Sequence, residues 1–178
     1  MMIGLHKSLV TVYPYDETWP MEYQKEKEIL EKHLQGLDVR IEHVGSTAIP
    51  GLSAKPIIDI AIGAKDEVEL FKIAKRLEDA DYDMLNSYEE KGEVLARKGS
   101  PECRTHYIHI QLLGSEYWNE FMYFKRFMLD HPESIKEYQK LKEELSVKYT
   151  DERKKYTASK NEFISNILKQ AYKMYKLD

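Results

Sequence analysis

Residues 41–62 have the sequence IEHVGSTAIPGLSAKPIIDIAI, and this stretch decides the fold. It predicts a short strand over residues 39–44, an irregular loop that begins at Gly45, and a second strand over residues 56–62. Isoleucines occupy positions 58, 60 and 62 of the second strand, so side-chain alternation places Asp59 on the opposite face. We therefore expect the isoleucines to face the core and Asp59 to point away from it.

The loop between these strands carries groups that suit an anionic ligand. Gly45 has no Cβ, so a ligand can approach the backbone closely at this position. Ser46 and Thr47 offer hydroxyls and backbone N–H groups at a turn, and Lys55 adds a positive charge. Each feature alone is typical of an ordinary turn. Together with Asp59, they favour a phosphate or metal site.

The flanking sequence predicts further elements in the first 114 residues. Thr18 suits the N-cap of a helix that precedes the first strand, and Asp66 suits the N-cap of a helix after the second. Two weaker strands are expected near residues 82–86 and 93–98, and a clearer one over residues 105–113. These elements predict an α+β fold, with a mixed β-sheet and helices packed on one side.

The last part of the chain, residues 115–178, is expected to be a helical segment. Apolar residues recur there at helical spacing, first after Ser115, then around Pro132, and again after Asp151. No linker-like stretch interrupts the chain, so a single domain of residues 1–178 is predicted. The segment from residue 121 onward carries 13 Lys and Arg against 9 Asp and Glu. This excess of positive charge either pairs with the acidic first part of the chain or forms a surface that binds phosphate.

Strand alternation also sorts the residues of the predicted strand at 105–113. Ile108 and Ile110 share the apolar face, which leaves His109 on the other face, expected to be that of Asp59. Arg104 and His106 fall on the apolar side at the start of the strand, and we expect them to extend beyond the core.

In the last helix, Lys160 follows Tyr156 by four residues and precedes Phe163 by three, so all three share one helical face. This spacing predicts that Lys160 is carried towards the site with the two rings. Lys142 is instead expected on an outer surface.

The bulk composition narrows the function classes. A chain of 178 residues with 42% hydrophobic and 33% charged residues is typical of a globular protein, and a net charge of −4 predicts neither broad nucleic-acid nor membrane adhesion. Cys103 is the only cysteine, so no disulfide framework or thiolate metal site is expected, and the thiol is predicted to be inert. The N-terminal residues are too short and polar a run for a secretory signal, and the cytoplasm is the expected location.

The segment GSTAIPGLSAKPIIDI at residues 45–60 closely resembles the signature of the GrpB family, a member of the nucleotidyltransferase superfamily. The resemblance extends to YPYDETWP at residues 13–20, to RTHYIHI at residues 104–110, and to Tyr156, Lys160 and Phe163. Nucleotidyltransferases of this fold place acidic residues on the strand after a Gly-Ser turn and on a later strand. Those carboxylates hold divalent metals that bridge the triphosphate and activate the acceptor hydroxyl.

The resemblance implies Mg²⁺ or Mn²⁺ as cofactor and a nucleoside triphosphate as substrate or ligand. It implies that Asp59 is a catalytic residue and metal ligand. The chain departs from the pattern at Ala61, where a second carboxylate is expected, and at His109, where a third is expected. His109 is therefore predicted as the second metal ligand and catalytic residue, with Glu42 on the preceding strand as a substitute acid. The predicted phosphate-binding residues are Gly45, Ser46, Thr47, Lys55, Arg104, His106 and Lys160.

Three functions are compatible with these residues. The first is metal-dependent transfer of a nucleoside monophosphate to an unknown acceptor. The second is a nucleotide-binding or phosphate-binding module without catalysis, and the third is a protein-interaction domain that retains only the fold. The sequence indicates neither the acceptor nor the base preference.

Overall fold

A five-stranded mixed sheet forms the centre of the computed structural model, which describes residues 3–85 and 92–175. The spatial order is β1-β2-β5-β4-β3, with β2 and β5 parallel and the other neighbours antiparallel. The strand bounds are β1 Arg40–Val44, β2 Ile58–Ala64, β3 Asp83–Met84, β4 Val94–Gly99 and β5 Arg104–Leu112. The predicted α+β architecture is confirmed. Residue 86, the end of one weak predicted strand, lies outside the described residues.

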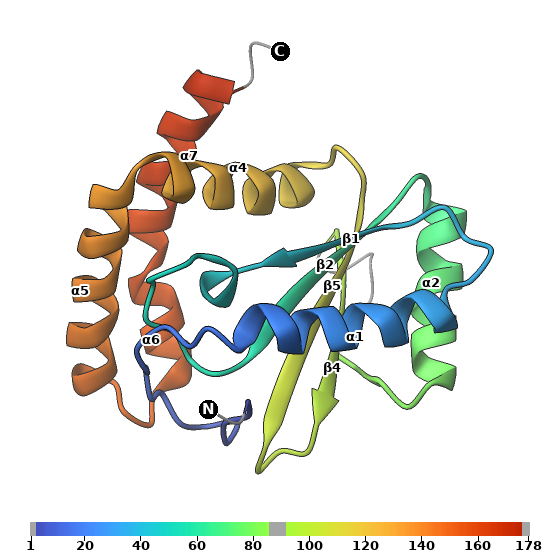
Figure 1. Ribbon diagram of the computed structural model, residues 1–178, viewed down its shortest axis with the longest axis horizontal. Coiled ribbons are helices and arrows are strands. Elements are labelled where there is room, and N and C mark those ends of the chain that lie inside the picture. Colours follow the sequence, from blue (N-terminus) through green and yellow to red (C-terminus); the bar gives the residue numbers. More distant parts are fainter. Residues whose placement is uncertain (1–2, 86–91, 176–178) are drawn as a thin grey trace.

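The helices divide between the two faces of this sheet (Figure 1). Helices α1 and α2 pack on one face, whereas α4 contacts β1, β2 and β5, and α7 packs against α4. Figure 1 shows α5, α6 and α7 together beside the sheet. The bounds are α1 Trp19–His33, η1 Ser46–Ala48 (a 3-10 turn), α2 Glu67–Asp79, α4 Glu116–Asp130, α5 Pro132–Lys148, α6 Arg153–Ser159 and α7 Asn161–Tyr175.

The main core lies between the sheet and the pair α1 and α2. Ile58, Ile60 and Ile62 are fully buried there, as the alternation predicts, and they pack with Trp19 and Leu70 from the two helices. Burying one such isoleucine stabilises the fold by roughly 1.5–3 kcal/mol. Because this face of β2 is committed to the core, the side chains at positions 59, 61 and 63 must point to the opposite face.

Of the four helix starts predicted at Thr18, Asp66, Ser115 and Asp151, those at Asp66 and Ser115 are confirmed with a side-chain cap. The Asp66 side chain accepts a hydrogen bond from the backbone N–H of Glu69 at 2.8 Å, and the Ser115 hydroxyl accepts one from Trp118 at 3.3 Å. Thr18 occupies the N-cap position of α1 but makes no side-chain cap bond. Its hydroxyl instead donates to Asp16 at 2.6 Å, so the acidic residue two positions earlier competes successfully for it.

The helix predicted after Asp151 is interrupted. Helix α6 ends at Ser159 and α7 begins at Asn161, with Lys160 between them in a helical backbone conformation. The N-cap of α6 is Glu152 rather than Asp151. The break places Lys160 at the junction of the two helices. Among the described residues, no helix is long and apolar enough to cross a membrane.

Candidate functional site

A cleft lies on the face of the sheet that carries Asp59, between the strands and helices α4 to α7. It consists of two adjoining cavities of about 280 and 270 Å³. Both cavities are lined by Ser46, Asp59, His109 and Lys160. We call the first cavity the basic compartment; its other polar lining residues are Thr47, Lys55, Tyr107, Lys142, Arg153, Tyr156 and Thr157. We call the second the aromatic compartment; its further lining residues include Glu93, Gln111, Tyr117, Glu120, Phe121, Phe124 and Tyr138.

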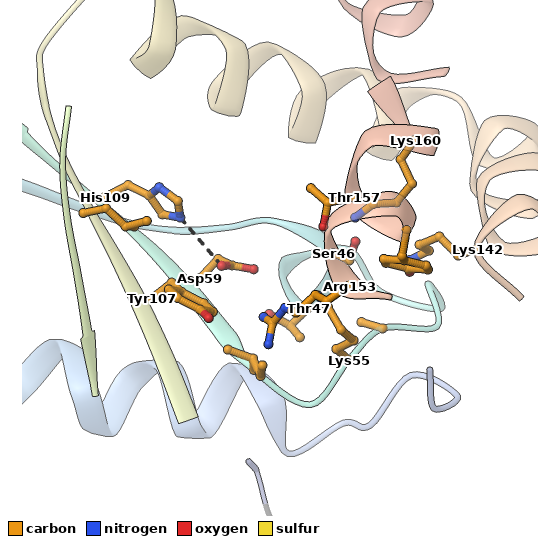
Figure 2. A pocket seen from close by; sticks show the side chains of 14 residues that line it. Ser46, Thr47, Lys55, Asp59, Tyr107, His109, Lys142, Arg153, Thr157 and Lys160 are labelled. Carbon is orange, nitrogen blue, oxygen red and sulfur yellow. Dashed lines mark ion pairs between the residues drawn. The ribbon is translucent and has the colours of Figure 1, made fainter. Parts of the chain in front are cut away.

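Strand register brings Asp59 and His109 together. Asp59 lies opposite Tyr107 on the parallel neighbour β5, and Ala61 lies opposite His109. Asp59 and His109 are therefore diagonal neighbours on one face. The carboxylate Oδ1 of Asp59 lies 3.6 Å from Nε2 of His109, the contact that Figure 2 marks with a dashed line. The predicted placement of His109 on the face of Asp59 is confirmed.

Gly45 makes room for Asp59 itself. Its backbone has φ 70° and ψ −170°, a combination that is essentially restricted to glycine. A Cβ at this position would lie 2.6 Å from Oδ2 of Asp59 and 3.0 Å from its Cβ. The sequence predicted that the missing Cβ admits a ligand. The structure shows that the Asp59 carboxylate uses that space, while Gly45 also lines the aromatic compartment.

Gly45→Ala is therefore expected to destabilise the fold by ~1–3 kcal/mol, because it combines backbone strain with a collision against Asp59. Gly51→Ala is the matched control, since Gly51 has φ +80° but no atom within 4 Å of an added Cβ. Denaturant unfolding of both variants should show the larger loss for Gly45→Ala. Equal losses would show that Asp59 moves aside without cost.

The turn after Gly45 is held from the far face of the sheet. His43 is buried, stacks on Tyr23 at 4.7 Å between ring centroids, and its Nε2 lies 3.0 Å from the Thr47 hydroxyl. Burial, helped by the nearby Lys125 charge, lowers the pKa of His43 to about 4, so the ring is neutral at physiological pH. This geometry supports a role for His43 in orienting the turn.

His109 is clamped between two carboxylates. Its Nε2 faces Asp59, and its Nδ1 lies 3.2 Å from Oε2 of Glu93, which also accepts a hydrogen bond from Gln111 at 2.9 Å. Burial opposes the charged ring, but hydrogen bonds and charge from the two carboxylates outweigh it and raise the pKa of His109 to about 9. His109 is therefore a cation at neutral pH.

His109→Gln should consequently destabilise the protein in a pH-dependent way. A raised folded-state pKa contributes stability that is complete below the unfolded value of 6.5 and is lost as the pH rises through about 9. The difference in unfolding free energy between wild type and variant should be on the order of 3 kcal/mol near pH 6 and should fade above pH 9.

The measurement is urea unfolding of both proteins from pH 5.5 to 9.5, with the exposed His33→Gln as control. Subtracting the unfolding free energy of the variant from that of the wild type cancels the contribution of other groups that titrate over the same pH range. A difference that does not change with pH would contradict a cationic His109.

The acidic groups of the cleft do not fit a two-metal centre. No three His, Cys, Asp or Glu side chains within residues 3–85 and 92–175 are grouped so that they could hold a metal ion. Metal ligation needs a deprotonated imidazole nitrogen, whereas both nitrogens of His109 face carboxylates that favour its protonated form. The prediction of His109 as a metal ligand therefore conflicts with the geometry.

Glu42 does not replace the absent second acid. It shares a sheet face with Asp59, because it lies opposite Ala61 on β2. However, its Oε1 pairs with Nε of Arg40 at 2.9 Å, and neither compartment is lined by it. Its predicted catalytic role is not supported, because Arg40 and the position of β1 at the sheet edge hold it away from the cleft.

Four basic side chains converge on the basic compartment from three separate segments (Figure 2). Lys55 comes from the loop before β2, Lys142 from α5, and Arg153 and Lys160 from α6 and the turn after it. Burial and the neighbouring Arg153 and Lys160 lower the pKa of Lys55 to about 7. Burial likewise lowers the pKa of Lys160 to about 8, although Asp59 opposes the shift.

Lys142 is a correction to the sequence prediction. It was expected on an outer surface, but its side chain is only 1% exposed, lines the basic compartment and donates a hydrogen bond to the Ser53 carbonyl. Burial and the Lys160 and Lys55 charges hold its pKa well below the ordinary range. The signal was present in the sequence, because Lys142 follows the inward-facing Tyr138 by one helical step of four residues.

Arg104 and His106 do not reach the cleft, which corrects their predicted role in phosphate binding. They lie on the α1 side of the sheet, opposite to Asp59, and are 1% and 5% exposed. Leu5 pairs with Arg104 through two backbone hydrogen bonds, so the N-terminal segment covers the start of β5. Nε2 of His106 lies 4.0 Å from the buried carboxylate of Glu26, and burial lowers the His106 pKa.

Sequence reasoning missed Glu93, Arg153 and Tyr138. Glu93 stands directly before β4, and only the pairing of β4 with β5 brings its carboxylate to His109. Arg153 has no local signal; its guanidinium lies over the ring of Tyr107 on β5, 5.5 Å from the centroid. Tyr138 lies on the inward face of α5 and lines the aromatic compartment.

The chain is similar to proteins of a known family. The sequence model of the family described as GrpB protein matches residues 9–170. The Glutamate-rich protein GrpB of Alkalihalophilus pseudofirmus is 35% identical over 174 residues, covering 95% of this chain and 99% of that protein.

Among solved structures, the conserved protein GrpB from Enterococcus faecalis has a TM-score of 0.83 and 28% identity, covering 93% of this chain and 99% of that one. Cid1 poly(U) polymerase with MgGTP bound has a TM-score of 0.40 and 14% identity, covering 70% of this chain and 44% of that one. A similarity as low as the second carries no argument about function.

Proposed function

The chain belongs to the GrpB protein family, and from that premise we propose that its cleft binds the phosphate groups of a nucleotide. The observation that carries the proposal is the convergence of Lys55, Lys142, Arg153 and Lys160 on one cavity. The proposal takes the protein to be cytoplasmic, as the sequence predicts, where nucleoside triphosphates are available as ligands.

Crowding of buried cations is the physical basis of this proposal. Each of the three lysines has a lowered pKa because burial and its basic neighbours disfavour the ammonium form. An anionic ligand would remove this penalty by providing the counter-charge that the cavity lacks, since Asp59 supplies only one negative charge on this side. Lys and Arg are also the side chains that suit multiply charged phosphates best.

The sheet side of the cavity adds hydrogen-bonding groups to these charges. Ser46 from η1 and Thr157 from α6 both line the basic compartment, and Figure 2 shows them between Asp59 and the side chains of Lys142 and Lys160. The amides of Ser46 and Thr47 precede the first hydrogen bond of the turn, which runs from Ala48 N–H to the Gly45 carbonyl. Such groups at the start of a turn have no acceptor within it.

Asp59 fits one divalent ion and not two. Mg²⁺ commonly binds through one or two carboxylates together with substrate phosphates and water, so Asp59 is the residue that would hold an ion arriving with the nucleotide. When bound, that ion would neutralise phosphate charge. Nucleotidyl transfer to an acceptor is the further step implied by the family resemblance, and it requires the larger acidic set that this cleft does not offer. We therefore propose binding, with transfer as a result that the same assay can detect.

A thermal-shift screen tests the proposal. The four common nucleoside triphosphates and inorganic tripolyphosphate are each added with and without Mg²⁺, and product is sought by chromatography. A ligand present at 100 times its Kd should stabilise the fold by ~2.7 kcal/mol, which is readily detected. Stabilisation by none of these polyphosphates would overturn the proposal and leave a protein-interaction role. Nucleotide turnover would extend it to transfer.

Binding should weaken as the pH rises. Lys55 and Lys160 have pKa values of about 7 and about 8 in the free protein, so both are mainly charged at pH 6 and mainly neutral at pH 9. A bound anion must raise both pKa values, and affinity should therefore be highest below pH 7 and fall through pH 8 and above. The measurement is calorimetry with sulfate. The charge of sulfate is constant over this pH range, so any change in affinity comes from titration of the protein. An affinity independent of pH would contradict the assignment of these lysines.

A further inference from the structure

The aromatic compartment opens directly from the phosphate-binding residues. It shares Ser46, Asp59 and Lys160 with the basic compartment, and its volume is about 270 Å³. Phe121 and Phe124 on α4 line it with Tyr138 from α5. A ligand whose phosphates lie among the lysines would have this compartment as the adjoining cavity for its organic part. The Tyr138 ring is already stacked on Phe163, with 4.8 Å between the ring centroids, so Phe121 and Phe124 are the rings that would pack against a flat heteroaromatic group.

Apart from Lys160 and the hydroxyls of Ser46, Tyr117 and Tyr138, the polar side chains of this compartment offer hydrogen-bond acceptors to a ligand. Nε2 of Gln111 already donates to Glu93 at 2.9 Å, and Nδ1 of His109 lies 3.2 Å from the same oxygen, so these two donors are used within the protein. Gln111 is fully buried, and its carbonyl oxygen has no hydrogen-bond partner within the described part of the chain. A buried acceptor without a partner is costly and favours the approach of a donor.

Glu120 adds a charged acceptor to the same wall. It is half-buried on α4, it lines the aromatic compartment, and no residue in the ranges 3–85 and 92–175 forms a hydrogen bond or ion pair with it. Burial, together with the charge of Glu116, raises its pKa. A ligand N–H that hydrogen-bonds to the carboxylate would offset both penalties. Tyr117 also lines this wall, but its hydroxyl both donates and accepts and so does not discriminate.

From this arrangement we infer that the aromatic compartment binds the base of the nucleotide and selects bases that carry an amino group over uracil. This inference rests on the proposed function, because the phosphates must lie in the basic compartment. Adenine, guanine and cytosine each present an exocyclic amino group that donates hydrogen bonds. Uracil presents two carbonyl oxygens and a single N–H, so it can pair with only one of the two acceptors, Glu120 and the Gln111 oxygen, and it turns a carbonyl towards the other.

The expected size of the preference follows from unsatisfied hydrogen bonds. A site built of acceptors penalises a ligand that leaves them unpaired in a buried setting, and loss of one such pairing costs at least ~10-fold in affinity. The tightest of ATP, GTP and CTP should therefore bind at least ~10-fold more tightly than UTP. Tripolyphosphate, which has no base, should bind more weakly than that nucleotide while still occupying the lysines.

The test is calorimetry of ATP, GTP, CTP, UTP and tripolyphosphate with wild type, Glu120→Gln and the control Glu116→Gln. Glu116 lies one helical turn before Glu120 on the same helix, is exposed, and lines neither compartment. Glu120→Gln supplies an amide donor that can pair with a uracil carbonyl, so it should reduce the preference against UTP to about threefold or less. Tripolyphosphate affinity should change in neither variant.

The outcomes separate the two proposals. If tripolyphosphate and all four nucleotides bind equally well, phosphate binding stands and base selection is overturned. A preference for UTP, or a preference that survives unchanged in Glu120→Gln, also overturns it. If no polyphosphate binds, the proposed function fails and the base selection fails with it.

Discussion

Lys160→Ala is expected to weaken nucleoside triphosphate binding by about 10- to 100-fold at pH 7, the loss of one charge-assisted contact of roughly 1.5–3 kcal/mol. Lys160 is the only one of the four basic residues that lines both compartments. Its ammonium lies over the ring of Tyr156, 4.6 Å from the centroid, and Asp59 acts on its pKa. The side chain therefore lies between the phosphate-binding lysines and the carboxylate that would hold Mg²⁺.

The loss of affinity measured for Lys160→Ala should be a lower limit for what Lys160 contributes to binding. Removing its charge also relieves the repulsion that lowers the pKa of Lys55, so Lys55 becomes more fully charged and compensates in part. The control is Lys140→Ala, because Lys140 is exposed on α5 and lines neither compartment. Lys142 is unsuitable as a control, since it is buried in the same cavity.

The measurement is calorimetry of nucleoside triphosphate binding to both variants at two salt concentrations. A smaller salt dependence of affinity is expected for Lys160→Ala than for wild type or Lys140→Ala, because one fewer charge contacts the ligand. If the two alanine variants behave alike, Lys160 does not contact the phosphates.

Asp59→Asn is expected to abolish the increase in nucleotide affinity caused by Mg²⁺, an effect of about tenfold or more if the carboxylate holds the ion. Affinity for the metal-free nucleotide should be unchanged or higher, because a negative charge is removed beside Lys160. A loss of affinity that occurs only with Mg²⁺ distinguishes loss of a metal ligand from general damage to the cleft.

The matched control is Glu42→Gln, on the same face of the sheet but paired with Arg40 and outside both compartments. It should retain the wild-type response to Mg²⁺. Calorimetry with ATP, with and without Mg²⁺, is the measurement, and thermal unfolding checks that Asp59→Asn remains folded despite the altered contact with His109. An unchanged Mg²⁺ effect in Asp59→Asn would place any ion elsewhere.

The two variants also separate the possible functions of the cleft. A protein that needs Lys160 but shows no effect of Mg²⁺ through Asp59 would be a phosphate-binding module. A protein that needs both residues, and also turns over the nucleotide, would act in transfer despite Ala61 and the cationic His109. The cluster of basic side chains supports the requirement for Lys160 more directly than the requirement for Mg²⁺ at Asp59.

The sequence by itself determined the local geometry of the site. The isoleucines at positions 58, 60 and 62 could be buried only if Asp59 pointed to the opposite face, and the same rule placed His109 on that face of β5. These predictions succeeded because strand alternation is decided by residues adjacent in the chain. The caps at Asp66 and Ser115 succeeded for the same reason.

Only the tertiary structure decided which side chains meet across the cleft. Local periodicity gives the direction of a side chain relative to its own element, but what it meets depends on how distant elements pack. Hence Arg104, expected beyond the core, is covered by the N-terminal segment, and Glu93 reaches His109 only through the pairing of β4 with β5. The basic compartment likewise exists because α5 and α6 bring Lys142 and Arg153 to the loop that carries Lys55, far earlier in the chain; Lys142 and its partner Ser53 are 89 residues apart.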